Sequence, residues 1–437
     1  MNDFIIKISD KNYVNHVGLL FIANFLNDSK IFSRINLISK IKKNTGFISD
    51  YDIVKTCICL ISLGKTNFDD VEQYRKDKYF KKALKLKIVP SAPIIRQRLE
   101  TYDEEMWAVI RQINIEVIKS NFTNEVIEVN GVHYLIIESD VTPMDNSKTK
   151  KEGVARTYKN FFGYSPMMSY IGVSGFMLNN ELRNGDAHSN CDGTDKYFTE
   201  TVGLARQIGP FPLLAIMDSG NDDGKLVSNF IEQNTEFIIK RNLRREPVEK
   251  YINYAAENCE TSRVDEKTGS TTYYARWERQ VGDRFVPIAV VVTRIIMDHK
   301  THQPCLMHQY EVDVYWNSLN LSAEIVEEQY HKHGTSEQYH SEFKSDLDME
   351  RLPSGKFSSN YTIMLFGMVS FNLLRMAGKQ LLRTGKVPGV RRGKRLRIRT
   401  VIQNIMYMAG QYIEHARQSV LNIFRGYPWT PSFVMIT

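Results

Sequence analysis

The spacing of apolar residues changes near Asn121, and this change sets the fold class on each side of it. Over residues 12–121, apolar residues recur at three- and four-residue intervals, as in residues 53–63 and 71–86, which predicts helices. After Asn121, short apolar runs alternate with turn-forming residues such as Gly131 and Pro143, which predicts strands. We therefore expect an all-α N-terminal domain followed by a domain built on a sheet.

The second domain has an α/β order of elements. A β-meander is expected first, followed by helix, strand, helix and strand. A polar, strand-rich segment at residues 241–309 is interpreted as an insertion, because it interrupts this order. The predicted strands cover residues 126–129, 134–137, 167–173, 175–182, 211–217, 236–239 and 312–315, and the predicted helices cover residues 92–117, 196–207, 223–233, 323–349, 361–382 and 401–424.

Composition is that of a globular protein, with 42% hydrophobic and 24% charged residues among 437. The start of the chain lacks the basic and apolar regions of a secretory leader, and the longest apolar stretches fall short of the roughly 18 residues that a membrane span needs. We expect a cytoplasmic protein without a membrane partner.

Five cysteines form no Cys-x-x-Cys pair, which argues against a structural zinc site or a disulfide framework.

Two groups of basic residues suggest a polyanionic partner. Arg96 and Arg98 lie in the first turns of the helix predicted after Ser91, where a DNA-recognition helix would present them; a plain amphipathic helix is an equal alternative. A second group lies in a stretch without acids, which is either a solvated loop or a DNA-binding segment. This basic segment contains Arg383, Lys386, Arg391, Arg392, Lys394, Arg395, Arg397 and Arg399.

Two acidic residues end predicted strands. Asp140 follows the apolar strand at 134–137, and Asp218 directly follows the run at 211–217. An acid at the end of a buried strand lies at the edge of a sheet, where α/β folds place ligand sites. Acids next to Gly and Pro also cap turns, so each residue alone favours capping over chemistry.

A third acid lies on the helix predicted at 323–349. Tyr330, His333, Glu337 and Lys344 are at offsets of 0, 3, 7 and 14, which a regular helix keeps within a sector of about 60°. Such a face could hold a metal and grip phosphates beside it. An exposed charged helix is the structural alternative, and Gly334 weakens the helix by about 1 kcal/mol relative to Ala.

Three carboxylates suit the hydrolysis of a phosphodiester by two metal ions. Mg²⁺ prefers oxygen ligands and is usually held by one or two carboxylates plus substrate phosphates, so three acids suffice for two ions. We expect Asp140 to bridge two Mg²⁺ ions and Asp218 and Glu337 to bind one each, with Mn²⁺ able to substitute.

These residues resemble the motifs of the bacterial insertion-sequence DDE transposases, in the IS-four-like cut-and-paste superfamily and its thirteen-eighty group. The spacing of Tyr330, His333, Glu337 and Lys344 is similar to the Tyr-x2-Arg-x3-Glu-x6-Lys signature, except that His333 replaces Arg. The segments that begin at Asp140 and Asp218 resemble the first and second acid motifs. The similarity extends over most of the chain.

The resemblance implies a ribonuclease H-like α/β core with an all-α N-terminal domain, a β-rich insertion and a helical C-terminal extension. The domains it implies are a helical DNA-binding domain at 1–122, the core at 123–240 and 310–382, the insertion at 241–309, and the basic segment with a C-terminal helix at 383–437. It also implies that the insertion handles a DNA hairpin, for which Trp277 is the candidate base-stacking residue. The exchange of Arg for His333 weakens the expected phosphate grip.

The resemblance implies a cut-and-paste DNA transposase acting through a hairpin intermediate. Its partners would be double-stranded DNA, as terminal inverted repeats and target, and a second copy of the chain in a homodimer near the nucleoid. Two alternatives stay open: a catalytically decayed transposase that binds DNA, and a ribonuclease H-like nuclease without strand transfer.

Overall fold

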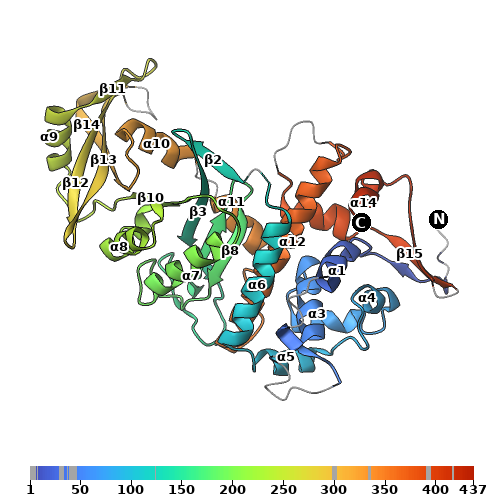
Figure 1. Cartoon of the computed structure of the whole chain (residues 1–437). Coiled ribbons are helices and arrows are strands. Elements are labelled where there is room, and N and C mark those ends of the chain that lie inside the picture. Colours follow the sequence, from blue (N-terminus) through green and yellow to red (C-terminus); the bar gives the residue numbers. More distant parts are fainter. Residues whose placement is uncertain are drawn as a thin grey trace. The chain divides into compact units, whose positions relative to one another are not determined.

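The computed structural model describes residues 6, 8–28, 34–36, 38, 47–123, 125–297, 303–332, 336–389, 395–415 and 418–437. The chain forms two compact units. Unit 1 combines residues 1–121, 144–154 and 341–437, and unit 2 combines residues 122–143 and 155–340. Each unit is therefore assembled from more than one segment, and unit 1 joins the two ends of the chain (Figure 1).

Unit 1 is mainly helical and is built around α12 (Phe357–Arg383). This helix contacts α3 (Asp50–Ser62) and α6 (Glu104–Ser120), and nearly all its residues are buried. Its polar groups are bonded inside the unit: the Trp107 indole donates to the Thr362 hydroxyl at 2.8 Å, and Asn372 donates to Asn114 at 2.6 Å. These bonds stabilise the helix packing because polar groups removed from water need partners.

The other elements of unit 1 surround this helix and add a small sheet. Strand β15 (Gly410–His415) lies between β1 (Tyr13–Val14) and β16 (Gln418–Ile423), and both pairs are antiparallel. The remaining elements are α1 (Leu19–Asp28), η1 (Phe68–Tyr74), α4 (Lys78–Ala83), α5 (Ala92–Leu99), β4 (Met144–Asp145), η3 (Glu342–Asp346), α13 (Ile398–Val401), η4 (Ile402–Met406) and α14 (Thr430–Ile436).

Unit 2 contains a mixed ten-stranded sheet within the part of the chain that the structure describes. Strands β3 (Val132–Val141), β7 (Met167–Ile171) and β8 (Phe176–Glu181) are antiparallel, and β2 (Val126–Val129) pairs with β3. On the other side of β3, strands β9 (Leu213–Met217) and β10 (Glu236–Lys240) run parallel to it. Helices α7 (Thr194–Arg206) and α8 (Gly224–Glu232) connect these strands, so the α/β core is confirmed.

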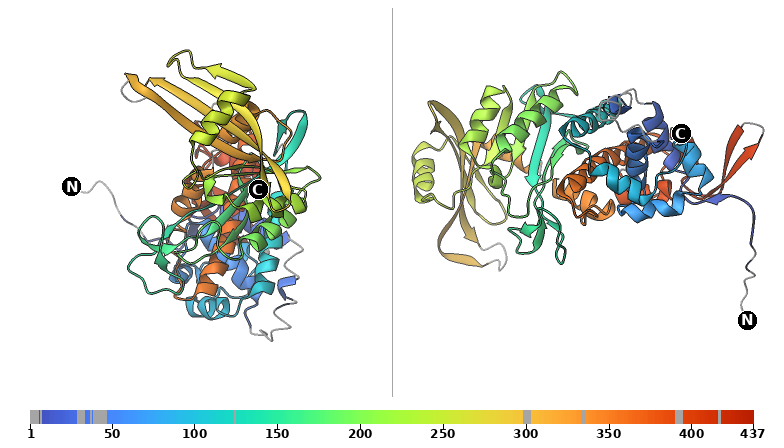
Figure 2. Two further views of the ribbon diagram at one scale, coloured as in Figure 1. Left: turned by 90° about the vertical axis from the view of Figure 1, so that its left-hand side faces the viewer. Right: turned by 90° about the horizontal axis from the view of Figure 1, so that it is seen from below.

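The sheet continues from β10 into long strands. β14 (Pro304–Asn317) pairs with β10 and with β13 (Arg284–Met297), followed by β12 (Thr271–Val281) and β11 (Thr261–Val264). Helices α9 (Glu249–Asn258) and α10 (Ala323–Lys332) contact opposite faces of these strands (Figures 1 and 2). Three short elements, β5 (Ala155–Arg156), β6 (Phe162–Tyr164) and η2 (Ser219–Asn221), complete unit 2 with α11 (Ser336–Ser341).

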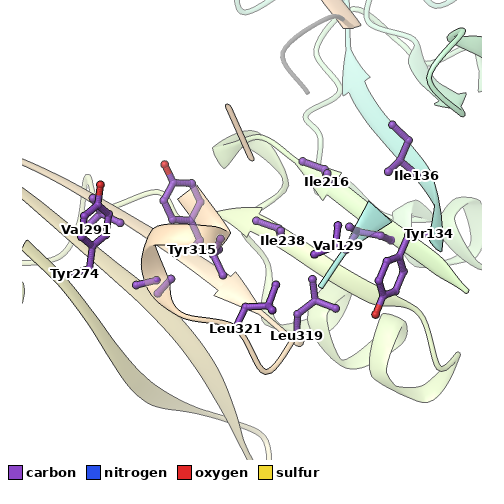
Figure 3. Close-up of a cluster of buried hydrophobic side chains, with 14 residues drawn as sticks. Val129, Tyr134, Ile136, Ile216, Ile238, Tyr274, Val291, Tyr315, Leu319 and Leu321 are labelled. Atoms are coloured by element: carbon purple, nitrogen blue, oxygen red, sulfur yellow. The ribbon is translucent and has the colours of Figure 1, made fainter. Parts of the chain in front are cut away.

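One buried cluster joins the two parts of this sheet. Ile136, Leu214 and Ile238 come from the central strands, whereas Val291 and Tyr315 come from the long strands (Figure 3). All are less than 6% exposed, so the long strands and the α/β core share one hydrophobic interior.

Several predicted helices differ from the structure. Residues 92–117 form two helices, α5 and α6, with residues 100–103 between them. A helix over 401–424 is wrong, because residues 410–415 form β15 and residues 418–423 form β16, and a β-carbon on Gly410 would lie 3.0 Å from the Asn422 carbonyl oxygen. Pairing with neighbouring strands here overrides the helical spacing of the apolar residues. The polar insertion also contains the helix α9, which was not predicted.

The helix predicted at 323–349 is only partly observed. α10 ends at Lys332 and α11 begins at Ser336, on either side of residues outside the described part of the chain. The next turn, η3, is π-helical and ends at Asp346. Offsets calculated at 3.6 residues per turn therefore do not apply through η3, because a π turn has a different pitch.

The apolar helix α12 is longer than the sequence analysis predicted for the longest apolar stretch of the chain. Within the described residues, it is the helix long and apolar enough to cross a membrane by length and composition. Its apolar stretch is completely buried inside unit 1, as expected for the central helix of a protein core.

Candidate active site

Asp140 and Asp218 lie side by side at the ends of two parallel strands. Ser139 of β3 is paired with Met217 of β9, so the two acids are the next residue on each strand. This arrangement follows from the sequence, because both strands are buried apolar runs with an acid at the end. Asp140 is the last residue but one of β3, and Asp218 is the first residue after β9. The structure thus brings together two of the three predicted acids.

Local hydrogen bonds hold the Asp218 carboxylate. Oδ1 accepts from the backbone N–H of Gly220 at 3.1 Å and from Nδ2 of Asn221 at 2.9 Å. Asn221 is fully buried, and its side-chain amide also lies 3.3 Å from the Ser139 carbonyl oxygen. Asn221 therefore links the turn after β9 to the strand that carries Asp140, a role that its sequence position did not reveal.

The two carboxylates interact electrostatically. Desolvation raises the pKa of Asp218, and the nearby charge of Asp140 raises it further, against the lowering effect of the hydrogen bonds from Asn221 and Gly220. A cation between two such carboxylates would relieve this repulsion. The pair is thus a candidate site for a divalent metal.

Burial and the charges of Asp140 and Asp218 raise the pKa of two nearby tyrosines. Burial, followed by the charges of Asp218, Asp313 and Asp140, raises the pKa of Tyr330 to about 12. Burial and then the charges of Asp140 and Asp218 raise the pKa of Tyr158, whose hydroxyl lies 3.5 Å from the Val141 carbonyl oxygen. The structure therefore places Tyr330 within the electrostatic influence of the acidic pair.

Glu337 lies on α11 and is exposed. Three residues later on this helix, His340 is buried, and its Nε2 lies 3.7 Å from Oδ2 of Asp140. Residues three apart share a helix face, so Glu337 is one turn away from a direct neighbour of Asp140. Among the described residues, no group of three or more His, Cys, Asp or Glu side chains is close enough to hold a metal ion.

The other residues predicted to bind DNA differ in their surroundings. Lys344 lies in η3 of unit 1 and pairs with Glu350 at 3.5 Å. Arg98 pairs with the buried Asp50 at 2.9 Å, whereas Arg96 is half-exposed and lies 3.6 Å from Asp69. Arg395 forms an ion pair with Glu342. His333, Arg391, Arg392 and Lys394 lie outside the residues that the structure describes.

Trp277 is placed on β12 beside α9. Its ring stacks on Tyr254 of α9, with centroids 4.3 Å apart and an angle of 11° between the planes. Both side chains line a cavity of about 690 Å³ together with Phe285 and Asn317. An aromatic surface is therefore available in the insertion, although part of the Trp277 face is covered by Tyr254.

Comparison with known proteins identifies a family that covers nearly the whole chain. The model of the family described as Transposase DDE domain group 1 matches residues 6–437. A search of curated proteins found no significant match. Among solved structures, the chain is similar to the piggyBac transposase synaptic complex with hairpin DNA, at 12% identity and a TM-score of 0.45, covering 92% of this chain and 82% of the other.

Proposed function

Because the chain belongs to the family of DDE transposases with a group 1 domain, we propose that it cuts and joins DNA with metal ions held by Asp140, Asp218 and Glu337. The observation that carries this proposal is the placement of Asp140 and Asp218 at neighbouring ends of two parallel strands. The order of three antiparallel and two parallel strands, with α7 and α8 between them, supports a ribonuclease H-like core.

The donor set fits divalent cations. Two carboxylates at one sheet edge supply the oxygen ligands that Mg²⁺ prefers, and the raised pKa of Asp218 reflects a pair that a cation would stabilise. Asp140, Asp218 and Glu337 would hold the Mg²⁺ ions. Bound there, the ions would activate a water or 3′-hydroxyl and stabilise the leaving oxygen. Mn²⁺ is expected to substitute.

The surrounding residues position these groups. Asn221 and the Gly220 N–H hold Oδ1 of Asp218, so that Oδ2 can serve as the metal ligand. Tyr330, beside the acids, can donate a hydrogen bond to a phosphate, since its raised pKa keeps the hydroxyl protonated at neutral pH. His333, Lys344, Arg96, Arg98 and the basic segment remain the proposed DNA-binding residues.

The finer steps follow the resemblance to the IS-four-like superfamily. We propose cut-and-paste transposition through a DNA hairpin, with Trp277 stacking on a flipped base. The partners are the terminal inverted repeats, target DNA and a second copy of the chain, in the cytoplasm at the nucleoid. Stacking by Trp277 would use the face that Tyr254 leaves uncovered.

The test uses Asp140→Asn, Asp218→Asn and Glu337→Gln on DNA carrying the inverted repeats that flank the gene. Each is expected to abolish Mg²⁺-dependent nicking while DNA binding persists. Asp186→Asn is the control, because Asp186 is an exposed acid of the same unit that is not among the three proposed metal ligands. Full cleavage by Asp140→Asn or Asp218→Asn would contradict the assignment.

Two further outcomes separate the alternatives. Binding of the ends without nicking in either Mg²⁺ or Mn²⁺ would favour a decayed, DNA-binding transposase. Nicking without joined products in a plasmid assay would favour a nuclease that lacks strand transfer.

A further inference from the structure

His340 has an environment that its position in the sequence does not explain. Its side chain is 6% exposed, and its Nδ1 lies 3.2 Å from the Tyr170 hydroxyl. Nε2 lies 3.7 Å from Oδ2 of Asp140 and has no hydrogen-bond partner among the described residues. A buried imidazole nitrogen without a hydrogen-bond partner is unfavourable. The carboxylate of Asp140, which lies nearest to Nε2, is therefore the expected partner.

The carboxylate of Asp140 favours one tautomer of His340. If the Tyr170 hydroxyl donates to Nδ1, the proton of a neutral imidazole must be on Nε2, facing the carboxylate of Asp140. The opposite tautomer would direct a lone pair at a negative charge, which is electrostatically unfavourable. In this tautomer Nε2–H faces Oδ2 of Asp140 at 3.7 Å, while the Tyr170 hydroxyl, which is also placed to donate to Sδ of Met168, contacts Nδ1.

A second interaction fixes the helix that carries His340. Tyr339 is 5% exposed, and its ring packs on Tyr170 with centroids 5.1 Å apart. The ring also covers Gly175, where a β-carbon would lie 2.1 Å from Cζ of Tyr339. Gly175 has a φ of +64°, so the turn between β7 and β8 needs glycine for its conformation and for this close approach.

We propose that His340 is a positioning residue that orients the Asp140 carboxylate and docks the Glu337 helix beside it. Holding Oδ2 through Nε2–H leaves Oδ1 of Asp140 directed to the metal ions. Because Glu337 is one turn before His340, the same interaction sets the separation of the first and third acids. This inference rests on the proposed metal site and concerns how the protein assembles it.

The test measures Mn²⁺ binding to the full chain by the decrease of the free-ion paramagnetic resonance signal. His340→Ala is expected to weaken Mn²⁺ binding by about 10-fold or more, the usual effect of removing a group that orients a metal ligand. His340→Gln is expected to recover a large part of the affinity, because its amide nitrogen can donate from nearly the position of Nε2. Asp140→Asn should remove the binding.

His133→Ala is the matched control, since His133 is exposed on the same strand as Asp140 and should leave Mn²⁺ affinity unchanged. Thermal unfolding and DNA binding of each variant verify that the fold persists. Wild-type affinity in His340→Ala would overturn the proposal, and so would an equal decrease in the Ala and Gln variants. If the Mn²⁺ affinities of the variants change as expected but the wild-type protein does not cleave DNA, the positioning role is supported and the proposed function is refuted.

The docking of α11 is tested separately with two glycines. Gly175→Ala is expected to displace Tyr339 and weaken Mn²⁺ binding several-fold. Gly131→Ala is the control, because Gly131 has a similar φ of +78° but nothing within 4 Å of its β-carbon position. Equal Mn²⁺ affinity in the two variants would contradict the role of Tyr339 in setting the helix position.

Discussion

Glu138 precedes Asp140 by two residues on β3 and is 7% exposed. Burial raises the pKa of its carboxyl group to about 8. In the unfolded chain, the same group has a pKa of about 4.3. Between these values the unfolded chain releases a proton that the folded chain keeps, so the free energy of unfolding decreases as the pH rises.

Glu138→Gln is therefore expected to stabilise the protein at pH 8, by an amount on the order of a few kcal/mol, and to change little near pH 4. The glutamine side chain is similar in shape and does not ionise. Denaturant unfolding at both pH values, in the presence of a chelator, measures the effect. Equal changes at the two pH values would contradict the protonation argument.

Single residues differed in how well the sequence predicted them. Asp140 and Asp218 could be predicted to lie at one sheet edge because an acid at the end of a buried apolar strand is a local pattern. The spacing from Tyr330 to Lys344 does not follow one regular helix, since it begins on α10 and ends in η3. His340 and Asn221 were missed because their roles depend on interactions between elements, with Asp140 and Ser139, that no local spacing encodes. A histidine three residues after Glu337 was the available signal.

At the scale of elements, α12 contains a buried ion pair. Arg375 is 1% exposed, and its Nη1 lies 3.3 Å from Glu342 of η3, which is 2% exposed. Glu342 also accepts from the Ile398 N–H at 3.0 Å and pairs with Arg395. One carboxylate thus connects three elements of unit 1.

Glu342→Gln is expected to destabilise the protein by about 3 kcal/mol, because removing one partner leaves a buried charge without full compensation. Glu328→Gln is the control, since Glu328 pairs with Lys332 on the surface, where both side chains are more than half exposed. The control should change stability little. Denaturant midpoints measure both, and equal midpoints for the two variants would contradict the importance of this pair.

The sequence predicted element types best where periodicity was long and burial complete, as in α12. It failed at β15 and β16, where pairing with β1 decides the structure, and at η3, where the helix changes to a π turn. It also missed α9, because a short polar helix has a weak apolar pattern. In each case, interactions with distant segments outweigh local preference.

At the scale of the whole molecule, the basic segment shows that arginines with no acid near them in the sequence can pair with acids from distant parts of the chain. The stretch contains no acid, yet Arg397 and Arg399 pair with Asp346, whose side chain is completely buried. Arg395 pairs with Glu342. These arginines contribute to the stability of unit 1, so the basic residues of this acid-free stretch overstate the number of cations that it offers to DNA.

DNA binding by the basic segment is therefore expected to depend on Arg391, Arg392 and Lys394. Replacing all three with alanine should weaken DNA binding and reduce the slope of log affinity against log salt by up to about 0.9 for each phosphate that is no longer neutralised, with an unchanged unfolding midpoint. Arg397→Ala should instead lower the midpoint, because it removes hydrogen bonds to the buried Asp346. Binding titrations at several salt concentrations measure the slope, and an unaltered slope in the triple variant would show that DNA is bound elsewhere.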